Sequence, residues 1–355
     1  MAADAAAPLT PRAAILKMAP YKPPAEGRVG KLRLDFNENT VGCSSKVLAY
    51  LKEHLDRNIF SVYPEYSETR AALARFFEIA EPQLVLTNGT DEAIQVLVNT
   101  YVDDGDDVIV LHPSYAMYRF YAEVAGAAVR EISYRGPDLA FPLEELLDAI
   151  RPDTRAIMIA NPNNPTGTGI DVDSIRRILD RAPHAAVLVD EAYYEFCGVT
   201  AIDLIPHYPN LFLSRTFSKV YGMAAMRVGC LLSQQTNAAY VRKGQSPYSV
   251  NLLGAIAVRA AIEDSEYVAH YVAEVMLARD QIYDGLRRLG IPYVRSMANF
   301  VLFQVGGRAV EVRDKLRAMG ILVRDRSYEI PGSVRVTVGR REHAMSFLNA
   351  LEKIW

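Results

Sequence analysis

The sequence predicts an α/β protein whose main sheet is mostly parallel and covered by helices on both faces. Short apolar runs, many of them β-branched, alternate along the chain with segments of helical periodicity. The runs are almost wholly apolar, as expected for strands buried on both faces. A length of 355 residues with 50% hydrophobic content suffices for about two domains and a large core.

The expected strands lie at 84–87, 107–111, 156–160, 186–190, 211–214 and 228–232. Helices are expected between them at 91–101, 142–150 and 172–181, the last two beside proline or aspartate start signals.

A longer helical pattern at 265–288 begins at a serine, has Gly290 near its end, and could join two domains. After it we expect strands at 299–305, 321–324 and 334–338, a helix at 309–319 and a last helix from 342. This order is typical of a smaller α+β domain.

Composition narrows the class of partner to a small molecule. The net charge is −3 and the pI is near 6.1, and the charges are interspersed, which argues against nucleic acid or an anionic membrane. Cys43, Cys197 and Cys230 are widely spaced, so neither a disulfide framework nor a structural metal is expected. No run approaches the about 18 apolar residues of a membrane span. These features favour a reducing cytoplasm. The N-terminal segment contains charged residues and several prolines, so residues 1–30 are expected to form a loose arm.

Three polar clusters follow three of the expected strands. The turn at 161–167 follows the strand at 156–160, Asp190 closes the strand at 186–190, and residues 216–219 follow the strand at 211–214. Each alone could be an ordinary turn or a solvated strand end. Ligands in open parallel sheets bind outside the carboxyl ends of the strands, so the three together predict a binding site.

The strand at 84–87 passes through Gly89 into a helix that begins near Thr90 and Asp91. The free N–H groups of such a helix start attract phosphate, although an ordinary capped helix would look the same locally. Thr216, Ser218 and Arg227 add hydroxyl and guanidinium donors, which favour the phosphate interpretation.

The apolar run before Asp190 and Glu191 could also be the magnesium-binding strand of a nucleotide hydrolase. Such enzymes need a G-x-x-x-x-G-K-[ST] phosphate loop, and neither it nor G-x-G-x-x-G occurs in the chain. A noncatalytic α/β protein remains the other alternative. Lys219 argues against a noncatalytic protein. Its amine could act as a Schiff-base nucleophile if the polar clusters and the helix start at Gly89 held a carbonyl cofactor over it.

Together these residues resemble the fold-type-I aminotransferases that use pyridoxal phosphate, and most closely the histidinol-phosphate aminotransferase family. The resemblance extends from about Tyr21 to the C-terminus. It rests on the order and spacing of Asp35-Phe36-Asn37-Glu38-Asn39, Tyr63-Pro64-Glu65, Asn88-Gly89-Thr90-Asp91-Glu92, Pro113-Ser114-Tyr115, Asn161 to Gly167, Asp190-Glu191-Ala192-Tyr193, Arg215 to Lys219, Arg227-Val228-Gly229 and Val334 to Gly339.

The resemblance implies roles around the cofactor. Lys219 would bond to its aldehyde and then shuttle a proton as the base. Asp190 would pair with the pyridine nitrogen and keep it protonated. Asn164 and Tyr193 would hydrogen-bond the phenolic oxygen, and Tyr115 would stack on the ring. The phosphate would be held by groups from Gly89, Thr90, Asp91, Thr216, Ser218 and Arg227.

The resemblance also implies a quaternary and domain organisation. Tyr63 would reach the phosphate of a neighbouring subunit, which requires a homodimer with shared active sites. The large domain, with a seven-stranded sheet, would cover 46–264. The small domain would combine 31–45 with 265–355.

For the substrate, the resemblance implies transfer of the amino group of L-histidinol phosphate to 2-oxoglutarate, a step of histidine biosynthesis. Arg335 would clamp the anionic end of either substrate, and Arg324 with Tyr21 would serve the phosphate. A solvated, charged strand edge is the alternative for Arg324. An aromatic amino-acid aminotransferase or a threonine-phosphate decarboxylase of the same fold remains open.

Overall fold

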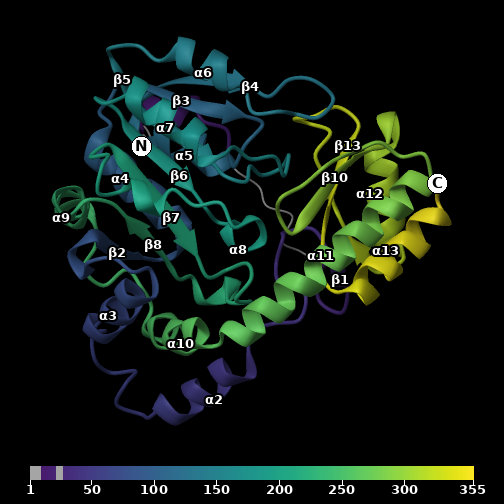
Figure 1. The fold of residues 1–355 in the computed structure, drawn as a ribbon, viewed down its shortest axis with the longest axis horizontal. Coiled ribbons are helices and arrows are strands. Elements are labelled where there is room, and N and C mark those ends of the chain that lie inside the picture. The colour runs from purple at the N-terminus through teal and green to yellow at the C-terminus, as the bar shows by residue number, and fades with distance from the viewer. Residues whose placement is uncertain (1–8, 21–26) are drawn as a thin grey trace, which may run out of the picture.

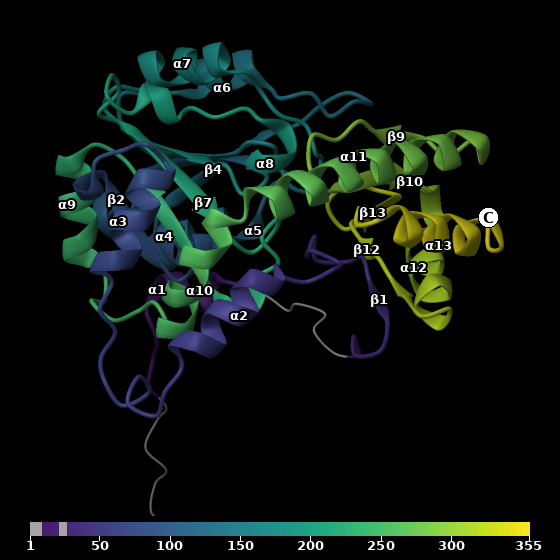
Figure 2. The same cartoon turned by 60° about the horizontal axis from the view of Figure 1, so that its bottom comes forward.

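The computed structural model describes residues 9–20 and 27–355, so the predicted contact of Tyr21 lies outside the described residues. Figures 1 and 2 show a larger body built on one sheet and a smaller body beside it. The long helix α11 (Ser265–Arg288) runs from the larger body into the smaller one. No helix within the described ranges is long and apolar enough to cross a membrane.

The larger body contains a seven-stranded sheet in the order β2-β8-β7-β6-β5-β3-β4. Its strands are β2 (Leu84–Thr87), β3 (Asp107–His112), β4 (Ala128–Ser133), β5 (Thr154–Ala160), β6 (Ala186–Asp190), β7 (Leu211–Thr216) and β8 (Gly229–Leu232). Strand β8 pairs antiparallel with β2 and β7, and the other pairs of this sheet are parallel. The predicted mostly parallel α/β fold is therefore confirmed.

Strand β4 is the one member of this sheet that no apolar run indicated. It lies at the edge, pairs with β3 alone and is nowhere fully buried. Its polar residues Arg130 and Glu131 are compatible with an edge position, because an edge strand is only partly covered. The central strands β5 and β6, in contrast, are buried almost throughout.

The two faces of the sheet belong to two separate hydrophobic clusters. Along β5, Ile157 and Ile159 enter one cluster while Ala156 and Met158 enter the other, because successive side chains of a strand point to opposite faces. The second face is covered by α4 (Gly89–Tyr101), α5 (Ala116–Ala125) and α9 (Gln235–Gly244). The first face is covered by α3 (Ser67–Phe76), α6 (Leu143–Ala149), α7 (Val172–Arg181) and α10 (Leu252–Glu263). The apolar area buried on both faces stabilises the sheet.

Shorter elements complete the larger body. These are α1 (Ala13–Lys17), which packs on α5, α2 (Ser45–His54), which packs on α10, α8 (Tyr194–Cys197), and 3₁₀ turns at Glu81–Gln83, Ile202–Leu204 and Ala224–Met226.

The smaller body has an antiparallel sheet in the order β12-β13-β10-β9. Its elements are β9 (Tyr293–Val294), β10 (Phe300–Gln304), β12 (Arg324–Asp325), β13 (Ser333–Thr337), a 3₁₀ turn at Gly306–Arg308, and helices α12 (Ala309–Ala318) and α13 (Arg341–Glu352). Apart from the strand expected at 321–324, the expected helices and strands of this region occur within a few residues of their predicted ends.

One prediction in this region is wrong. The single strand expected at 321–324 is two strands, β11 (Ile321–Leu322) and β12, which belong to different sheets. The N-terminal strand β1 (Leu32–Arg33) pairs in parallel with β11, and Leu34 continues the pairing by donating to the Leu322 carbonyl at 2.9 Å. The chain therefore changes partner at Val323, which turns Arg324 towards β13.

Candidate active site

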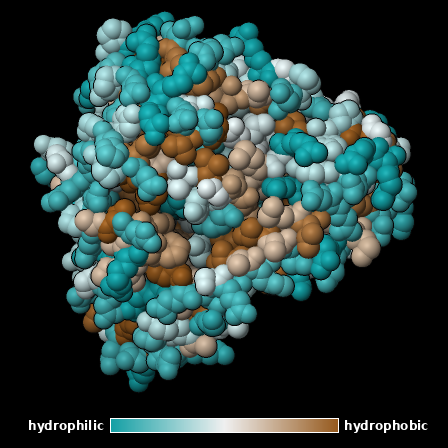
Figure 3. Space-filling view, in the orientation of Figure 1, coloured by the Kyte–Doolittle hydropathy of each residue, from teal (hydrophilic) through white to brown (hydrophobic). Residues whose placement is uncertain are grey.

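The carboxyl ends of β5, β6 and β7 meet beside a cavity of about 230 Å³. Ala160, Asp190 and Ser214 are register partners across these strands, so the loops that follow them start side by side. In Figure 3 hydrophobic residues gather along the junction of the two bodies, on a surface that is otherwise mostly hydrophilic. Ten of the predicted residues line the cavity: Thr90, Asp91, Tyr115, Asn164, Asp190, Tyr193, Thr216, Ser218, Lys219 and Arg227.

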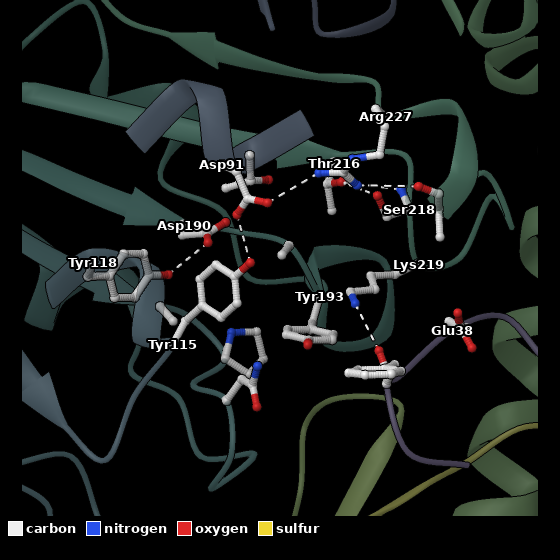
Figure 4. A pocket seen from close by; sticks show the side chains of 17 residues that line it. Glu38, Asp91, Tyr115, Tyr118, Asp190, Tyr193, Thr216, Ser218, Lys219 and Arg227 are labelled. Carbon is white, nitrogen blue, oxygen red and sulfur yellow. Dashed lines mark hydrogen bonds and ion pairs between the residues drawn. The ribbon is translucent and has the colours of Figure 1, made fainter. Parts of the chain in front are cut away.

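Lys219 lies in the loop that follows β7, and its amine points into the cavity (Figure 4). Its Nζ donates to the Phe36 carbonyl at 3.2 Å and lies 5.7 Å from the centroid of the Tyr193 ring. Phe36 comes from the N-terminal segment that enters the smaller body through β1. The amine is therefore held where both bodies meet.

Asp190 is the last residue of β6, and its carboxylate is 4% exposed. Ser214 Oγ donates to Oδ1 at 2.9 Å, and Tyr118 Oη donates to Oδ2 at 2.7 Å. Burial raises the pKa of Asp190 to about 6, while these two donors act in the opposite direction. Such a carboxylate is well placed to take a cationic partner from the cavity.

The start of α4 forms the predicted phosphate cradle. Gly89 has φ of +74°, and a Cβ there would come within 2.6 Å of Arg227 Nη2, so the guanidinium lies directly against the glycine. Thr90 Oγ1 is buried and has no hydrogen-bond partner within the described residues. Thr216 Oγ1 donates to Ser218 Oγ at 3.0 Å on the other side of the cradle. A phosphate would satisfy these donors, which is the fit that the cofactor requires.

The Asp91 side chain has a role beyond the predicted one of its backbone amide. Its Oδ1 accepts from Tyr115 Oη at 2.7 Å, and its Oδ2 lies 3.3 Å from Arg227 Nη2 (Figure 4). Burial, and then Asp91, raise the pKa of Tyr115, which keeps the phenol protonated as a donor. Asp91 thereby links the residue expected to cover the ring to the arginine expected to hold the phosphate.

Tyr193 and Asn164 line the same cavity and are connected to the smaller body. Tyr193 Oη accepts from Asn37 Nδ2 at 2.9 Å, and the Tyr193 ring packs edge-on against Phe300 at 5.2 Å. Asn164 Oδ1 accepts from Arg335 Nη1. The two side chains are thus positioned by contacts from elements far away in sequence.

Arg335 and Arg324 do not line the cavity themselves. Arg335 is 4% exposed, and its Nη2 donates to the Asp35 carbonyl at 2.7 Å, while its Nε has no partner in the part of the chain that the structure describes. Burial, and then nearby Arg326 and Arg324, lower the pKa of Arg335 to about 10. Cationic charge therefore accumulates behind Asn164.

Arg324 is the register partner of Arg335 across β12 and β13. Its guanidinium lies 5.8 Å from the Phe36 ring centroid and makes no hydrogen bond or ion pair with the described residues. Arg326 is 9% exposed and donates to Tyr328 Oη at 2.9 Å. β12 is the edge strand of its sheet, and Arg324 and Asp325 are only half-buried, so a solvated, charged edge remains the alternative for Arg324.

Tyr63 lies outside the cavity of its own chain. Its side chain is 78% exposed and stacks on Tyr248 with ring centroids 4.6 Å apart.

Two contributors to the site, Tyr118 and Ser214, were not indicated by the sequence patterns, and the pairing of Arg215 with Glu191 was not predicted although both residues lie in the quoted motifs. Arg215 Nη2 lies 2.7 Å from Glu191 Oε2 with both side chains buried, and its guanidinium stacks 3.6 Å from the Tyr194 ring centroid. This ion pair joins the chain beside Asp190 to the chain that leads to Lys219. The spacing of Tyr118 three residues after Tyr115 could have found it, had a helix been predicted there.

The described residues contain no group of three or more His, Cys, Asp and Glu side chains arranged to hold a metal ion. One cavity of this fold contains a lysine amine, a buried carboxylate and a phosphate cradle. This combination defines a pyridoxal-phosphate enzyme.

Comparison with known proteins gives the same class. The family model of aminotransferase class I and II matches residues 29–351, and the chain belongs to this family, whose cofactor is pyridoxal phosphate. The histidinol-phosphate aminotransferase of Symbiobacterium thermophilum is 36% identical over 356 residues, which cover 96% of this chain and 97% of that protein. The resemblance drawn from the motifs is therefore confirmed.

Solved structures agree on the fold. The histidinol-phosphate aminotransferase of Sinorhizobium meliloti, in complex with pyridoxal-5'-phosphate, superposes with a TM-score of 0.82 at 22% identity, over 91% of each chain. The L-threonine-O-3-phosphate decarboxylase of Porphyromonas gingivalis superposes with a TM-score of 0.78 at 22% identity, over 91% of this chain and 99% of that one. The fold alone therefore does not separate the two reactions.

Proposed function

We propose that this aminotransferase moves the amino group of L-histidinol phosphate to 2-oxoglutarate, giving imidazole acetol phosphate and L-glutamate. The observation that carries the proposal is the cross-strand pair Arg324 and Arg335, whose guanidinium groups have donors that no described residue uses. The similarity to a histidinol-phosphate aminotransferase over nearly the full length supports the same substrate.

Pyridoxal phosphate, when bound, supplies an aldehyde that bonds to amines and a ring that accepts electrons from the substrate Cα. Lys219 would hold the cofactor through its Nζ and, once displaced by the substrate, would move a proton from the substrate Cα to the cofactor C4′. Its hydrogen bond to the Phe36 carbonyl supports this role, because it orients the amine into the cavity.

Asp190 would hold a proton on the pyridine nitrogen, since a buried carboxylate gains most from a cationic partner. Asn164 and Tyr193 would donate to the phenolic oxygen, and Tyr115 would stack on the ring. Gly89, Thr90, Asp91, Thr216, Ser218 and Arg227 would hold the phosphate through backbone N–H groups, hydroxyls and the guanidinium.

The two substrates differ in their anionic end, because histidinol phosphate carries a phosphomonoester and 2-oxoglutarate carries carboxylates. Arg335 would bind either anion, since it is buried and fixed by Asp35 and Asn164. Arg324 would add the second cation that a dianion requires, since it is half-buried and has no other partner among the described residues.

A homodimer with shared sites is part of the proposal. Tyr63 is exposed and lies beside a groove of about 430 Å³ that also involves Ile59, Val62, Leu252 and Ile256. The groove is also lined by Glu65, Glu68 and Arg259. An exposed groove that combines apolar and charged residues supports an interface with a second copy, from which Tyr63 would reach the partner's phosphate site.

We also propose domain limits of 46–264 for the large domain and of 31–45 with 265–355 for the small one. The pairing of β1 with β11 supports the assignment of the N-terminal segment to the small domain. A cytoplasmic location is supported by the three free cysteines.

The experiment that tests the reaction is product formation from histidinol phosphate and 2-oxoglutarate by the purified protein. Imidazole acetol phosphate and glutamate should form in equal amounts, and Lys219→Ala should abolish both. If glutamate forms with phenylalanine as the amino donor but not with histidinol phosphate, the proposed substrate is wrong, and release of carbon dioxide from O-phosphothreonine would favour the decarboxylase.

A further inference from the structure

Tyr118 uses its hydroxyl group to fix the carboxylate of Asp190. The side chain is 1% exposed, and its Oη donates to Asp190 Oδ2 at 2.7 Å (Figure 4). Ser214, which is fully buried, donates to the other oxygen at 2.9 Å. Each carboxylate oxygen therefore has one hydroxyl donor, from α5 on one side and from β7 on the other.

Helix α5 positions two sides of the cavity at once. Tyr115 is the N-cap residue of the helix and Tyr118 lies in its first turn, and their rings contact edge-on at 5.6 Å. Tyr115 is fixed by Asp91, and Tyr118 by Asp190. The residue expected to cover the ring and the residue that orients the carboxylate are therefore parts of one rigid element.

Hydroxyl donors also change the chemistry of a carboxylate. A carboxylate that accepts hydrogen bonds is a weaker base than one without them. When it shares a proton with a ring nitrogen, a weaker base leaves that proton on the nitrogen, and the ring stays the stronger electron acceptor.

We propose that Tyr118 and Ser214 are positioning residues that orient Asp190 and keep the shared proton on the pyridine nitrogen of the cofactor. This inference rests on the proposed pairing of Asp190 with that nitrogen. It does not depend on the identity of the amino donor.

The test compares the binding of two cofactor forms to the full-length protein freed of cofactor. One is pyridoxal phosphate, and the other is its 1-deaza analogue, which has a C–H in place of the ring nitrogen. Their dissociation constants are measured for the wild type, Tyr118→Phe, Ser214→Ala and Asp190→Asn. Tyr134→Phe is the matched control, because Tyr134 is also buried but its hydroxyl has no partner among the described residues.

The wild type should prefer pyridoxal phosphate, and Asp190→Asn should abolish the preference. Tyr118→Phe should reduce the preference about tenfold, the size expected for one hydrogen bond to a charged group, and Ser214→Ala should change it in the same direction. Tyr134→Phe should leave it unchanged. The affinity for the deaza analogue should stay within about twofold in Tyr118→Phe, because the missing hydroxyl acts through the nitrogen.

Three outcomes would overturn the inference, and they are distinguishable. If Asp190→Asn abolishes the preference but Tyr118→Phe and Ser214→Ala retain it in full, the two hydroxyls have no role in proton placement. If Asp190→Asn itself keeps the preference, the pairing with the nitrogen is wrong and the inference fails with it. Equal weakening of both cofactor forms in Tyr118→Phe would show a packing role only.

Discussion

Arg324 and Arg335 face each other as register partners on adjacent strands, with Arg335 buried and hydrogen-bonded and Arg324 half-buried and unpaired among the described residues. Among the described residues no carboxylate is bonded to either guanidinium group, and Glu329, which interacts electrostatically with both, is paired with Arg326. Such a pair is costly unless an anion joins it. The pair therefore indicates where the anionic end of the substrate binds.

Arg324→Ala should separate the phosphorylated substrate from others. We expect kcat/KM for histidinol phosphate to fall at least tenfold and that for phenylalanine to change less than threefold, because one charged contact to a dianion is worth roughly 2 kcal/mol. Arg335→Ala should lower both by about 100-fold. The exposed Arg341 on α13 provides the control Arg341→Ala. Unchanged rates for both substrates in Arg324→Ala would contradict the assignment.

The raised pKa of Asp190 predicts a pH-dependent stability of the cofactor-free protein. The pKa moves from 3.8 to about 6 on folding, so the folded state binds more protons in this range, and the stability contributed by this protonation is lost as the pH rises through about 6. Asp190→Asn removes that loss. The difference in free energy of unfolding, Asp190→Asn minus wild type, should therefore be about 2 kcal/mol larger at about pH 8 than at about pH 4.

Urea unfolding at the two pH values measures this difference, and a constant offset between the proteins does not affect it. Asp91 is the other carboxylate that raises the pKa of Asp190, so Asp91→Asn is the informative control and should reduce the effect. A pH-independent difference between Asp190→Asn and the wild type would show that Asp190 is not a buried, titrating group.

The ion pair of Arg215 and Glu191 should be costly to break from one side. Both side chains are nearly fully buried, so Arg215→Met leaves an unpaired buried carboxylate and should lower the free energy of unfolding by about 3 kcal/mol or more. The double variant with Glu191→Leu should lose less than Arg215→Met alone, because no charge is stranded. Denaturant titration measures both, and a double variant that loses the sum of the two single changes would contradict the interpretation.

Tyr63 should act across the proposed dimer. Tyr63→Phe should weaken pyridoxal phosphate binding about tenfold, whereas Lys219→Ala should lose the covalent attachment. Refolding the two variants together should produce hybrid dimers with one intact site. Borohydride trapping at limiting cofactor should then label more protein than either variant alone, and labelling equal to the average of the two variants would place Tyr63 outside the partner's site.

The sequence predicted the class of fold because buried parallel strands carry a distinctive apolar pattern, as β5 and β6 illustrate. It could not identify β4, because an edge strand with polar residues lacks that pattern. It also joined β11 and β12 into one strand, because the change of partner at Val323 depends on β1, about 290 residues away in the chain.

The sequence could predict those residues of the candidate site that follow the ends of strands. Asp190, Asn164, Thr216 and Lys219 meet in one cavity because their strands are adjacent and parallel. The contacts of Tyr118 with Asp190 and of Arg335 with Asn164 were not predictable, since they join elements whose distance in space no local pattern contains.

The most direct measurement of the central proposal is a side-by-side kcat/KM for histidinol phosphate, histidinol and phenylalanine, each with 2-oxoglutarate. This comparison isolates how the site distinguishes transition states. The phosphate contacts of Arg324 and Arg335 predict that histidinol phosphate exceeds both others by at least about 100-fold. Equal values for histidinol phosphate and histidinol, or a higher value for phenylalanine, would contradict it.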